Sequence, residues 1–139
     1  MTSSRFVLDT NVLVSAALFR QSKPSSVLRE ILNTGKLLVS LKILEELRNV
    51  LNREKFDRYI TAKDRRDFLA GLIRRSILVE PAIVITRCRD PKDNMVLELA
   101  VSGEANFIIT GDEDLLVLNP FQSIQIVTPD NWLSNFKQT

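Results

Sequence analysis

The amino-acid sequence contains no histidine and only one cysteine, Cys88. The missing histidine excludes every mechanism that needs an imidazole base and every histidine-rich zinc site. The single cysteine excludes an internal disulfide and any Cys-x-x-Cys redox or zinc motif, and it is what a reducing cytosol would permit. Any catalysis by this chain must therefore use carboxylates, hydroxyls, amines or a bound ion.

Long apolar runs are also missing. Three apolar residues separate Arg5 from Asp9, too few for the core of a signal peptide. No run approaches the ~18 apolar residues of a membrane span, so we expect a cytoplasmic protein with no membrane contact. The chain has 139 residues, about the length of one domain, and its 45% hydrophobic and 26% charged residues exclude a disordered adaptor.

Basic residues are absent from one long stretch. Residues 93–136 hold seven acids and no lysine or arginine, whereas residues 1–92 hold 18 of the 19 basic residues. The net charge of +2 therefore conceals a basic first part and an acidic last part. Such asymmetry hints at a polyanionic partner combined with a separate acidic function, with ordinary solvated helix faces as the alternative explanation.

Short apolar segments alternate with helical patterns along the whole chain. Strands are expected at residues 5–8, 37–40, 107–109, 126–127 and either 78–79 or 84–85. The intervening segments space their apolar residues as helices do, and Gly35 and Gly103 are expected to end two of them. Wholly apolar strands separated by helices predict an α/β fold, a three-layer α/β/α sandwich with a central parallel sheet of about five strands.

Two acids lie just beyond the ends of predicted strands. Asp9 comes after the first strand, and Asp112 comes after the strand at 107–109. Ligands of open α/β sheets bind beyond the carboxyl ends of the strands, so these two carboxylates face each other if their strands are neighbours. Each aspartate taken alone could instead cap the helix that follows it.

Two more acids are predicted on helices over the same edge of the sheet. Glu46 lies early in the helix after the second strand, and Asp93 lies in the first turn of the helix before residues 107–109. Four carboxylates in one place repel one another unless some are protonated or a divalent cation neutralises them. Oxygen ligands without histidine or cysteine indicate Mg²⁺ or Mn²⁺ rather than zinc or copper.

Four motifs carry these acids in order along the chain. They are Leu8-Asp9-Thr10-Asn11-Val12-Leu13, Glu45-Glu46-Leu47, Asp90-Pro91-Lys92-Asp93-Asn94 and Thr110-Gly111-Asp112-Glu113-Asp114-Leu115. Together they resemble the PIN-domain family of metal-dependent ribonucleases, in particular its bacterial and archaeal branch of toxins from toxin–antitoxin pairs. The resemblance covers residues 5–130 and implies a single PIN-like, Rossmann-like domain over residues 1–139.

The resemblance implies roles for individual acids. Asp9, Glu46, Asp93 and Asp112 match the catalytic, metal-binding acids of the family, and Asp114 matches an auxiliary acidic position that also serves the metal.

Several neighbours of these acids are ambiguous. The acid of the family directly precedes an apolar residue, which favours Glu46 over Glu45 because Leu47 follows it. Asp90 matches a frequent acidic position, but a cap before Pro91 is its favoured role.

Three polar residues could support the acids. Asn11, Asn94 and Thr110 are candidates for holding a carboxylate or a metal-bound water, with turn and capping chemistry as the alternative for each. Gly111 is expected to allow the close turn that brings Asp112 over the strand end.

The resemblance implies an endoribonuclease that hydrolyses RNA phosphodiester bonds with Mg²⁺ or Mn²⁺ as cofactor, an antitoxin protein as partner and a homodimer. The basic part of the chain offers phosphate contacts to RNA, and Arg87, Arg89 and Lys92 are expected nearest the site. Two alternatives stay open. One is a catalytically silent domain that binds RNA or a partner, and the other is a receiver-like signalling domain, which would need a lysine before its last helix.

Overall fold

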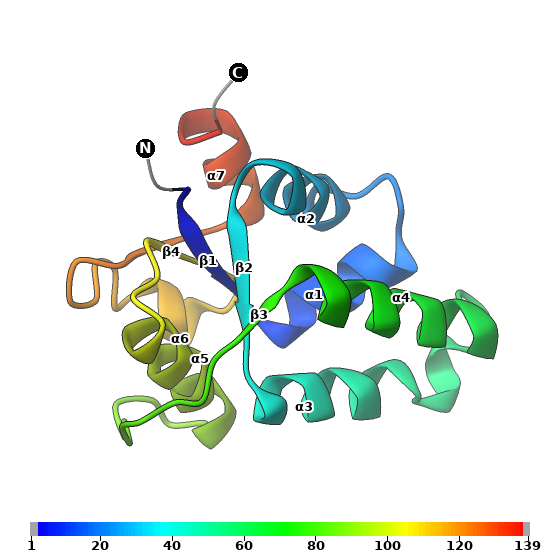
Figure 1. Cartoon of the computed structure of the whole chain (residues 1–139), viewed down its shortest axis with the longest axis horizontal. Helices are drawn as coiled ribbons and strands as arrows, with labels where there is room; N and C mark the ends of the chain where they lie inside the picture. Colours follow the sequence, from blue (N-terminus) through cyan, green and yellow to red (C-terminus); the bar gives the residue numbers. More distant parts are fainter. Residues whose placement is uncertain (1–2, 138–139) are drawn as a thin grey trace.

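The computed structural model describes residues 3–137 (Figure 1). Strands and helices alternate along the chain, as the apolar pattern predicts. In chain order they are β1 (Arg5–Leu8), α1 (Thr10–Leu18), α2 (Lys23–Thr34), β2 (Lys36–Val39), α3 (Leu41–Leu51), the short 3-10 helix η1 (Glu54–Phe56), α4 (Ala62–Arg75), β3 (Ile77–Leu78), α5 (Pro91–Ser102), β4 (Phe107–Ile109), α6 (Glu113–Leu116), β5 (Gln125–Val127) and α7 (Pro129–Asn135). Within residues 3–137, no helix combines the length and the apolar character needed to cross a membrane.

The strands form one parallel sheet in the order β3-β2-β1-β4-β5. β1 and β4 are neighbours at its centre, with Val7 opposite Ile108 and Leu8 opposite Ile109. The strand order reverses here, because β2 and β3 lie on one side of β1 while β4 and β5 lie on the other. The crevice beyond the carboxyl ends of β1 and β4 is therefore the position at which this topology binds ligands.

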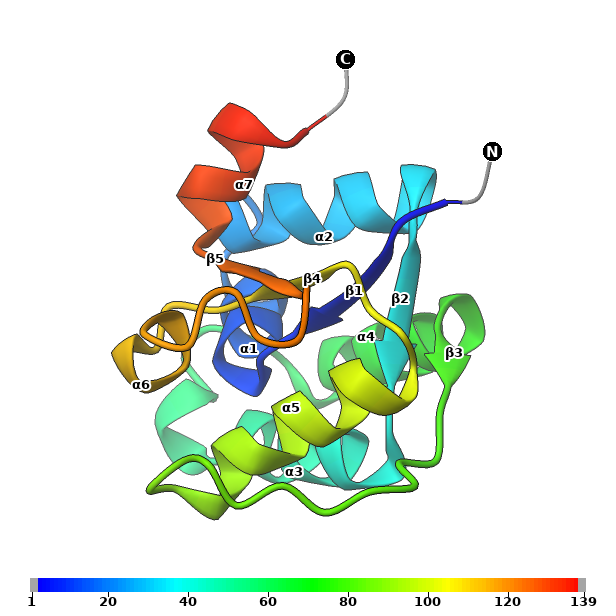
Figure 2. The same cartoon turned by 90° about the vertical axis from the view of Figure 1, so that its left-hand side faces the viewer.

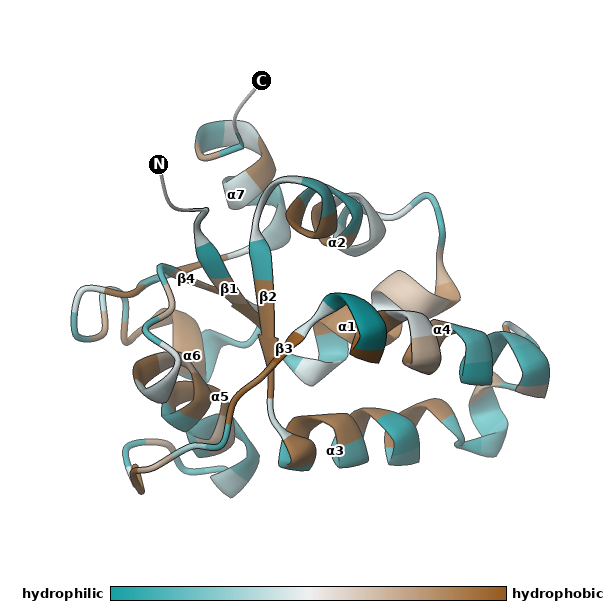
Figure 3. Ribbon diagram, viewed as in Figure 1, coloured by the Kyte–Doolittle hydropathy of each residue, from teal (hydrophilic) through white to brown (hydrophobic). Residues whose placement is uncertain are grey.

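Helices cover both faces of the sheet, which confirms the predicted α/β/α sandwich. In Figures 1 and 2, α5 lies on one face, and α1, α2 and α4 lie on the other. α7 packs against α2, and α3 crosses beyond the carboxyl ends of the strands. Figure 3 shows the central strands as mainly hydrophobic, since both of their faces are covered, and Val7 and Ile108 are completely buried.

The third strand is β3, at the first of the two predicted positions. The Val79 amide extends the pairing, since it donates to the Val39 carbonyl oxygen over 2.8 Å. The alternative at residues 84–85 is wrong, because these residues form no strand and Val84 is 86% exposed.

Side chains of α5 hold the segment from residue 79 to residue 90 in place of strand pairing. The acceptors, which we call the α5 ladder, are the side chains of Asn94, Glu98 and Ser102. They accept hydrogen bonds of 2.8, 2.9 and 3.1 Å from the backbone amides of Cys88, Ile85 and Ala82. Residues four apart share one face of a helix, so the segment runs antiparallel along α5 (Figure 2).

Gly35 and Gly103 follow the last residues of α2 and α5, as predicted, but for a different reason from a left-handed turn. No glycine in the described part of the chain has a positive φ. A Cβ atom at Gly35 would lie 2.6 Å from the Phe6 ring, and one at Gly103 would lie 2.5 Å from the Leu38 side chain. Both positions therefore require glycine because there is no room for a side chain.

Arg65 fixes the end of α3 against α4. Its buried side chain donates from Nε to the Leu51 carbonyl oxygen over 2.7 Å and forms an ion pair of 2.8 Å with Asp57. The carbonyl group at the carboxyl end of α3 thus finds a partner in a guanidinium rather than in water. This contact also fixes the backbone close to Arg53, which lies two residues beyond Leu51.

Candidate active site

Asp9 begins the site at the end of β1. Its backbone amide donates to the Ile109 carbonyl oxygen over 3.1 Å, which continues the β1–β4 pairing by one residue. Its side chain caps α1 by accepting a hydrogen bond of 2.7 Å from the Asn11 amide. The residue is only 7% exposed, so the carboxylate has little solvent around it.

Thr110 connects the two strand-end aspartates. Its hydroxyl donates to Asp9 Oδ2 over 2.5 Å and accepts a hydrogen bond of 3.0 Å from the Asp112 amide. Thr110 is completely buried, so no water competes for its hydroxyl. One side chain thereby links the Asp9 carboxylate to the backbone amide of Asp112, across the ends of β1 and β4.

Asp112 caps α6, and its Oδ1 accepts a hydrogen bond of 2.9 Å from the Asp114 amide. The prediction that Gly111 is needed for a close turn is wrong. Its φ is not positive, and a Cβ atom there would meet nothing within 4 Å. Thr110 and the cap of Asp112 shape this connection instead.

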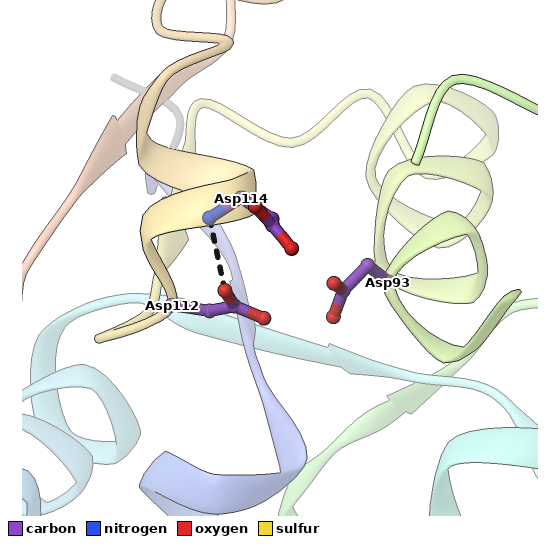
Figure 4. A group of neighbouring side chains, drawn as sticks. All are labelled: Asp93, Asp112 and Asp114. Atoms are coloured by element: carbon purple, nitrogen blue, oxygen red, sulfur yellow. Dashed lines mark hydrogen bonds between the residues drawn. The ribbon is translucent and has the colours of Figure 1, made fainter. Parts of the chain in front are cut away.

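Asp93 enters the site from the first turn of α5. Asp90 caps this helix by accepting from the Lys92 amide over 3.0 Å, and Pro91 occupies its first turn. Figure 4 shows the side chains of Asp93, Asp112 and Asp114 directed toward one another. Each offers a carboxylate oxygen within 4.8 Å of the others.

A cavity of about 170 Å³ joins the four predicted acids, which we call the acidic cavity. Its walls include Asp9, Glu46, Asp93 and Asp112, together with Asp90. Glu46 comes from α3 and is partly buried, whereas Glu45 is exposed and borders only the neighbouring groove. The two adjacent glutamates diverge because successive residues of a helix point about 100° apart.

The predicted helper residues have different surroundings. Asn11 borders the acidic cavity and donates its backbone amide to Asp9. Asn94 belongs to the α5 ladder, and its amide group exchanges hydrogen bonds with the Cys88 backbone rather than with a carboxylate. The predicted role of Asn94 therefore does not agree with its contacts.

Burial raises the pKa of three of the acids. The pKa of Asp93 rises to about 7, first because of burial and then because of the neighbouring Asp112 carboxylate, with smaller effects from Asp90 and Asp9. The pKa of Asp9 rises through burial although Thr110 and Asn11 donate to it.

The pKa of Glu46 also rises through burial, and the charges of Lys92 and Arg53 partly offset this rise. Its environment therefore contains positive charge as well as the other acids. These charges favour the ionised carboxylate that a general base or a metal ligand requires.

The donor set suits a hard divalent cation. Asp93, Asp112 and Asp114 bring carboxylate oxygens close together, and their mutual repulsion is what a bound cation would relieve. No nitrogen or sulfur ligand lies in the acidic cavity, whose walls are carboxylate, amide, hydroxyl, cationic and apolar side chains. Such ligands favour Mg²⁺ or Mn²⁺.

The cations near the site only partly match the prediction. Lys92 borders the acidic cavity, and Arg89 forms an ion pair of 2.9 Å with Asp114. Arg87 instead lies over the Phe121 ring, with its guanidinium carbon 5.6 Å from the centroid. The prediction did not include Arg53, which lies two residues beyond the end of α3 and also borders the cavity.

Comparison with known proteins reveals several similarities. The model of the PIN domain family matches residues 5–114. An uncharacterized protein of Methanocaldococcus jannaschii is 28% identical, over 96% of this chain and 92% of its own length.

Two solved structures share the fold. One is VapBC2 from Rickettsia felis bound to a DNA fragment from its promoter, with a TM-score of 0.60, 13% identity and coverage of 89% of this chain and 98% of the other. The second is FitAcB from Neisseria gonorrhoeae, with a TM-score of 0.55, 19% identity and coverage of 89% and 97%. At these identities the likeness concerns the fold.

Proposed function

Because this chain belongs to the PIN domain family, we propose that it is a metal-dependent endoribonuclease that hydrolyses RNA phosphodiester bonds. The observation that carries the proposal is the convergence of Asp9, Glu46, Asp93 and Asp112 on the acidic cavity. The family match excludes the receiver-like alternative. A catalytically silent binding domain stays as the alternative that experiment must exclude.

Asp9, Asp93 and Asp112, with Asp114 beside them, are the residues that would hold Mg²⁺ or Mn²⁺ in this proposal. When bound, such an ion supplies an acidified water and offsets the charge that develops on the phosphate. Thr110 holds the Asp9 carboxylate in one orientation through its 2.5 Å hydrogen bond. Glu46, across the cavity, orients the attacking water and accepts its proton at a carboxylate oxygen. The products would carry 5′-phosphate and 3′-hydroxyl ends.

Cleavage of a labelled RNA tests this proposal. Wild type should cut in Mg²⁺ or Mn²⁺ and stop in EDTA, and Asp9→Asn and Asp93→Asn should each lose about 100-fold or more of the rate. The matched control is Asp67→Asn. It removes an exposed carboxylate on α4 that pairs with Lys63 and does not line the acidic cavity. If Asp9→Asn and Asp93→Asn cut as fast as wild type, the assigned site is wrong. If wild type cuts no RNA, the silent binding domain is favoured.

We propose further that the chain is the toxin of a toxin–antitoxin pair acting in the cytoplasm, with an antitoxin as partner. The fold shared with VapBC2 and FitAcB supports the toxin role and the antitoxin partner. The one free cysteine in the described residues, Cys88, supports a reducing compartment such as the cytoplasm. Expression should arrest growth, and co-expression with a neighbouring small reading frame should relieve the arrest. Normal growth under strong expression would contradict the toxin role without affecting the nuclease.

A homodimer is also part of the proposal. Leu41, Leu78 and Val84 are 70%, 59% and 86% exposed around a cavity of about 630 Å³ beside the edge strand β3. Apolar side chains gathered in this way mark contact surfaces, and a second copy of the chain is the occupant that we propose. Light scattering after size exclusion should give twice the monomer mass for wild type and the monomer mass for Leu78→Glu. A wild-type monomer at all concentrations would contradict the dimer.

A further inference from the structure

A groove leads out of the acidic cavity between α3 and α5. The acidic cavity and a second cavity of about 440 Å³ have four wall residues in common, so the two spaces adjoin. The shared residues are Glu46, Val50, Arg53 and Lys92. We call the second space the α3–α5 groove, and Lys42 and Met95 border it without bordering the acidic cavity.

Three cations and two carboxylates, Glu45 and Glu46, border the α3–α5 groove and leave it with a net positive charge. Lys42, Arg53 and Lys92 are exposed, and none of them forms an ion pair with any residue from 3 to 137. Arg65 and Arg89, by contrast, are each paired with a carboxylate. The charges of Arg53 and Lys92 nevertheless act on Glu46, because both partly offset the rise that burial causes in its pKa.

Unpaired cations next to a group of acids have a clear physical use. A polyanion that approaches the acidic cavity is repelled, and fixed positive charges along its path offset that repulsion. Arg53 and Lys92 border both spaces and therefore lie where the strand would enter or leave the reacting position. Val50 and Met95 add apolar surface on which a sugar or base can rest.

The size of the groove limits its occupant. A volume of about 440 Å³ is in the range of pockets for one small ligand, so the groove accommodates about one nucleotide of a strand. The observations therefore favour a single strand whose phosphate contacts the cations while its base or sugar lies on the apolar floor.

We propose that the α3–α5 groove is the binding subsite for the nucleotide next to the scissile phosphate, with Arg53 and Lys92 binding its phosphates and Lys42 adding a third positive charge. The inference rests on the proposed ribonuclease function and names the residues that position its substrate. Arg53 and Lys92 bind the substrate in this proposal, and they influence bond breaking only through their charges near Glu46.

Binding without cleavage tests the subsite directly. The probe is a fluorescein-labelled single-stranded RNA of about 12 nucleotides, long enough to extend beyond the site on both sides. Its binding is followed by fluorescence anisotropy in EDTA, so that cleavage does not compete with binding. Arg53→Ala/Lys92→Ala should weaken binding about tenfold or more and reduce the salt slope by about 1.4, since each lost phosphate contact of a single strand contributes about 0.7. The charge-keeping variant Arg53→Lys/Lys92→Arg should retain most of the affinity.

The matched control is Arg66→Ala/Arg74→Ala. These two arginines are exposed on α4 and make no ion pair within residues 3–137, so the variant loses the same charge away from the groove. It should change the affinity less than about threefold. If both double variants lose affinity equally, binding follows net charge alone and the subsite is overturned.

Two further measurements separate this inference from its premise. In the cleavage assay, Arg53→Ala/Lys92→Ala should raise KM by a larger factor than it lowers kcat, because its main effect is on binding and its effect on bond breaking is limited to the loss of two charges near Glu46. If wild type never cleaves RNA but the anisotropy results hold, the nuclease proposal fails and the groove stands as a binding site for single-stranded RNA. If wild type cleaves and Arg53→Ala/Lys92→Ala behaves like the control, the subsite fails and the nuclease stands. A labelled oligoglutamate of equal charge that binds as tightly, with the same loss in the variant, would overturn RNA as the occupant in favour of an acidic protein segment.

Discussion

The four acids of the cavity come from two kinds of backbone, and the structure treats them differently. The strand-end residues Asp9 and Asp112 are held by hydrogen bonds from Thr110, Asn11 and the Asp114 amide. The helix residues Glu46 and Asp93 have no such hydrogen-bond donors among residues 3–137, and burial raises the pKa of both. Burial raises the pKa of Asp9 as well, so the two pairs differ in how firmly their carboxylates are held, and Asp93 is the acid whose pKa rises to about 7.

Two adjacent glutamates on α3 give the largest expected difference in cleavage rate. Glu46→Gln should reduce RNA cleavage about 100-fold, because the amide cannot accept a proton or bind a cation as the carboxylate does. Glu45→Gln removes the same charge from an exposed position that borders the α3–α5 groove but not the acidic cavity, so at saturating RNA it should change kcat less than about twofold. Steady-state cleavage rates at saturating Mg²⁺ provide the measurement. Equal losses in the two variants would show that only the summed charge of α3 matters.

The hydrogen bonds that hold the strand-end acids can be removed at Thr110. Thr110→Val keeps the shape of the side chain but leaves the buried Asp9 without its 2.5 Å donor and the Asp112 amide without its acceptor. We expect the free energy of unfolding to fall by about 1–3 kcal/mol and cleavage to fall by about 10-fold to 100-fold. Chemical denaturation and the cleavage assay measure the two effects.

Thr110→Ser is the control for this variant, since it retains the hydroxyl and should recover most of both quantities. Unchanged stability in Thr110→Val would mean that the strand ends are held by backbone pairing alone.

The titratable half of the site should appear in the pH dependence of stability. The pKa of Asp93 rises from its ordinary value of 3.8 to about 7 in the folded protein. The fold is therefore stabilised by the neutral carboxyl group, and this stabilisation is fully present below pH 3.8 and is lost as the pH rises through about 7. In EDTA, the melting temperature of wild type should therefore decline by a few degrees more than that of Asp93→Asn between pH 5 and pH 8, about the range in which the carboxyl ionises. Adding Mg²⁺ should remove the decline, because the cation stabilises the ionised carboxylates. Parallel curves for the two proteins would exclude Asp93 as the titrating group.

The fold and the strand-end acids could be predicted because their signals are local. Wholly apolar strands that stop at a polar residue place Asp9 and Asp112 at one edge of the sheet once β1 and β4 are known to be neighbours. Glu46 needed the family resemblance, since the helical pattern alone does not distinguish it from Glu45.

What could not be predicted depends on contacts across the chain. Asn94 lies one residue from Asp93, yet its partner is the backbone of an irregular segment that has no periodicity. The role of Arg53 depends on the approach of α3 to α5, and the need for Gly35 and Gly103 depends on the side chains of other strands. Each of these features requires the packed structure.

The α5 ladder has a consequence for how the chain tolerates insertions and deletions. Irregular surface segments usually accept a change of length, because few hydrogen bonds depend on their register. Between β3 and α5, however, three amides spaced three residues apart meet three acceptors spaced four residues apart. Removing one residue at position 86 or 87 would draw Ile85 and Ala82 out of register with Glu98 and Ser102 while Cys88 kept its partner. The segment that delivers Asp90, Lys92 and Asp93 to the site therefore has a fixed length, although it contains no strand and no helix.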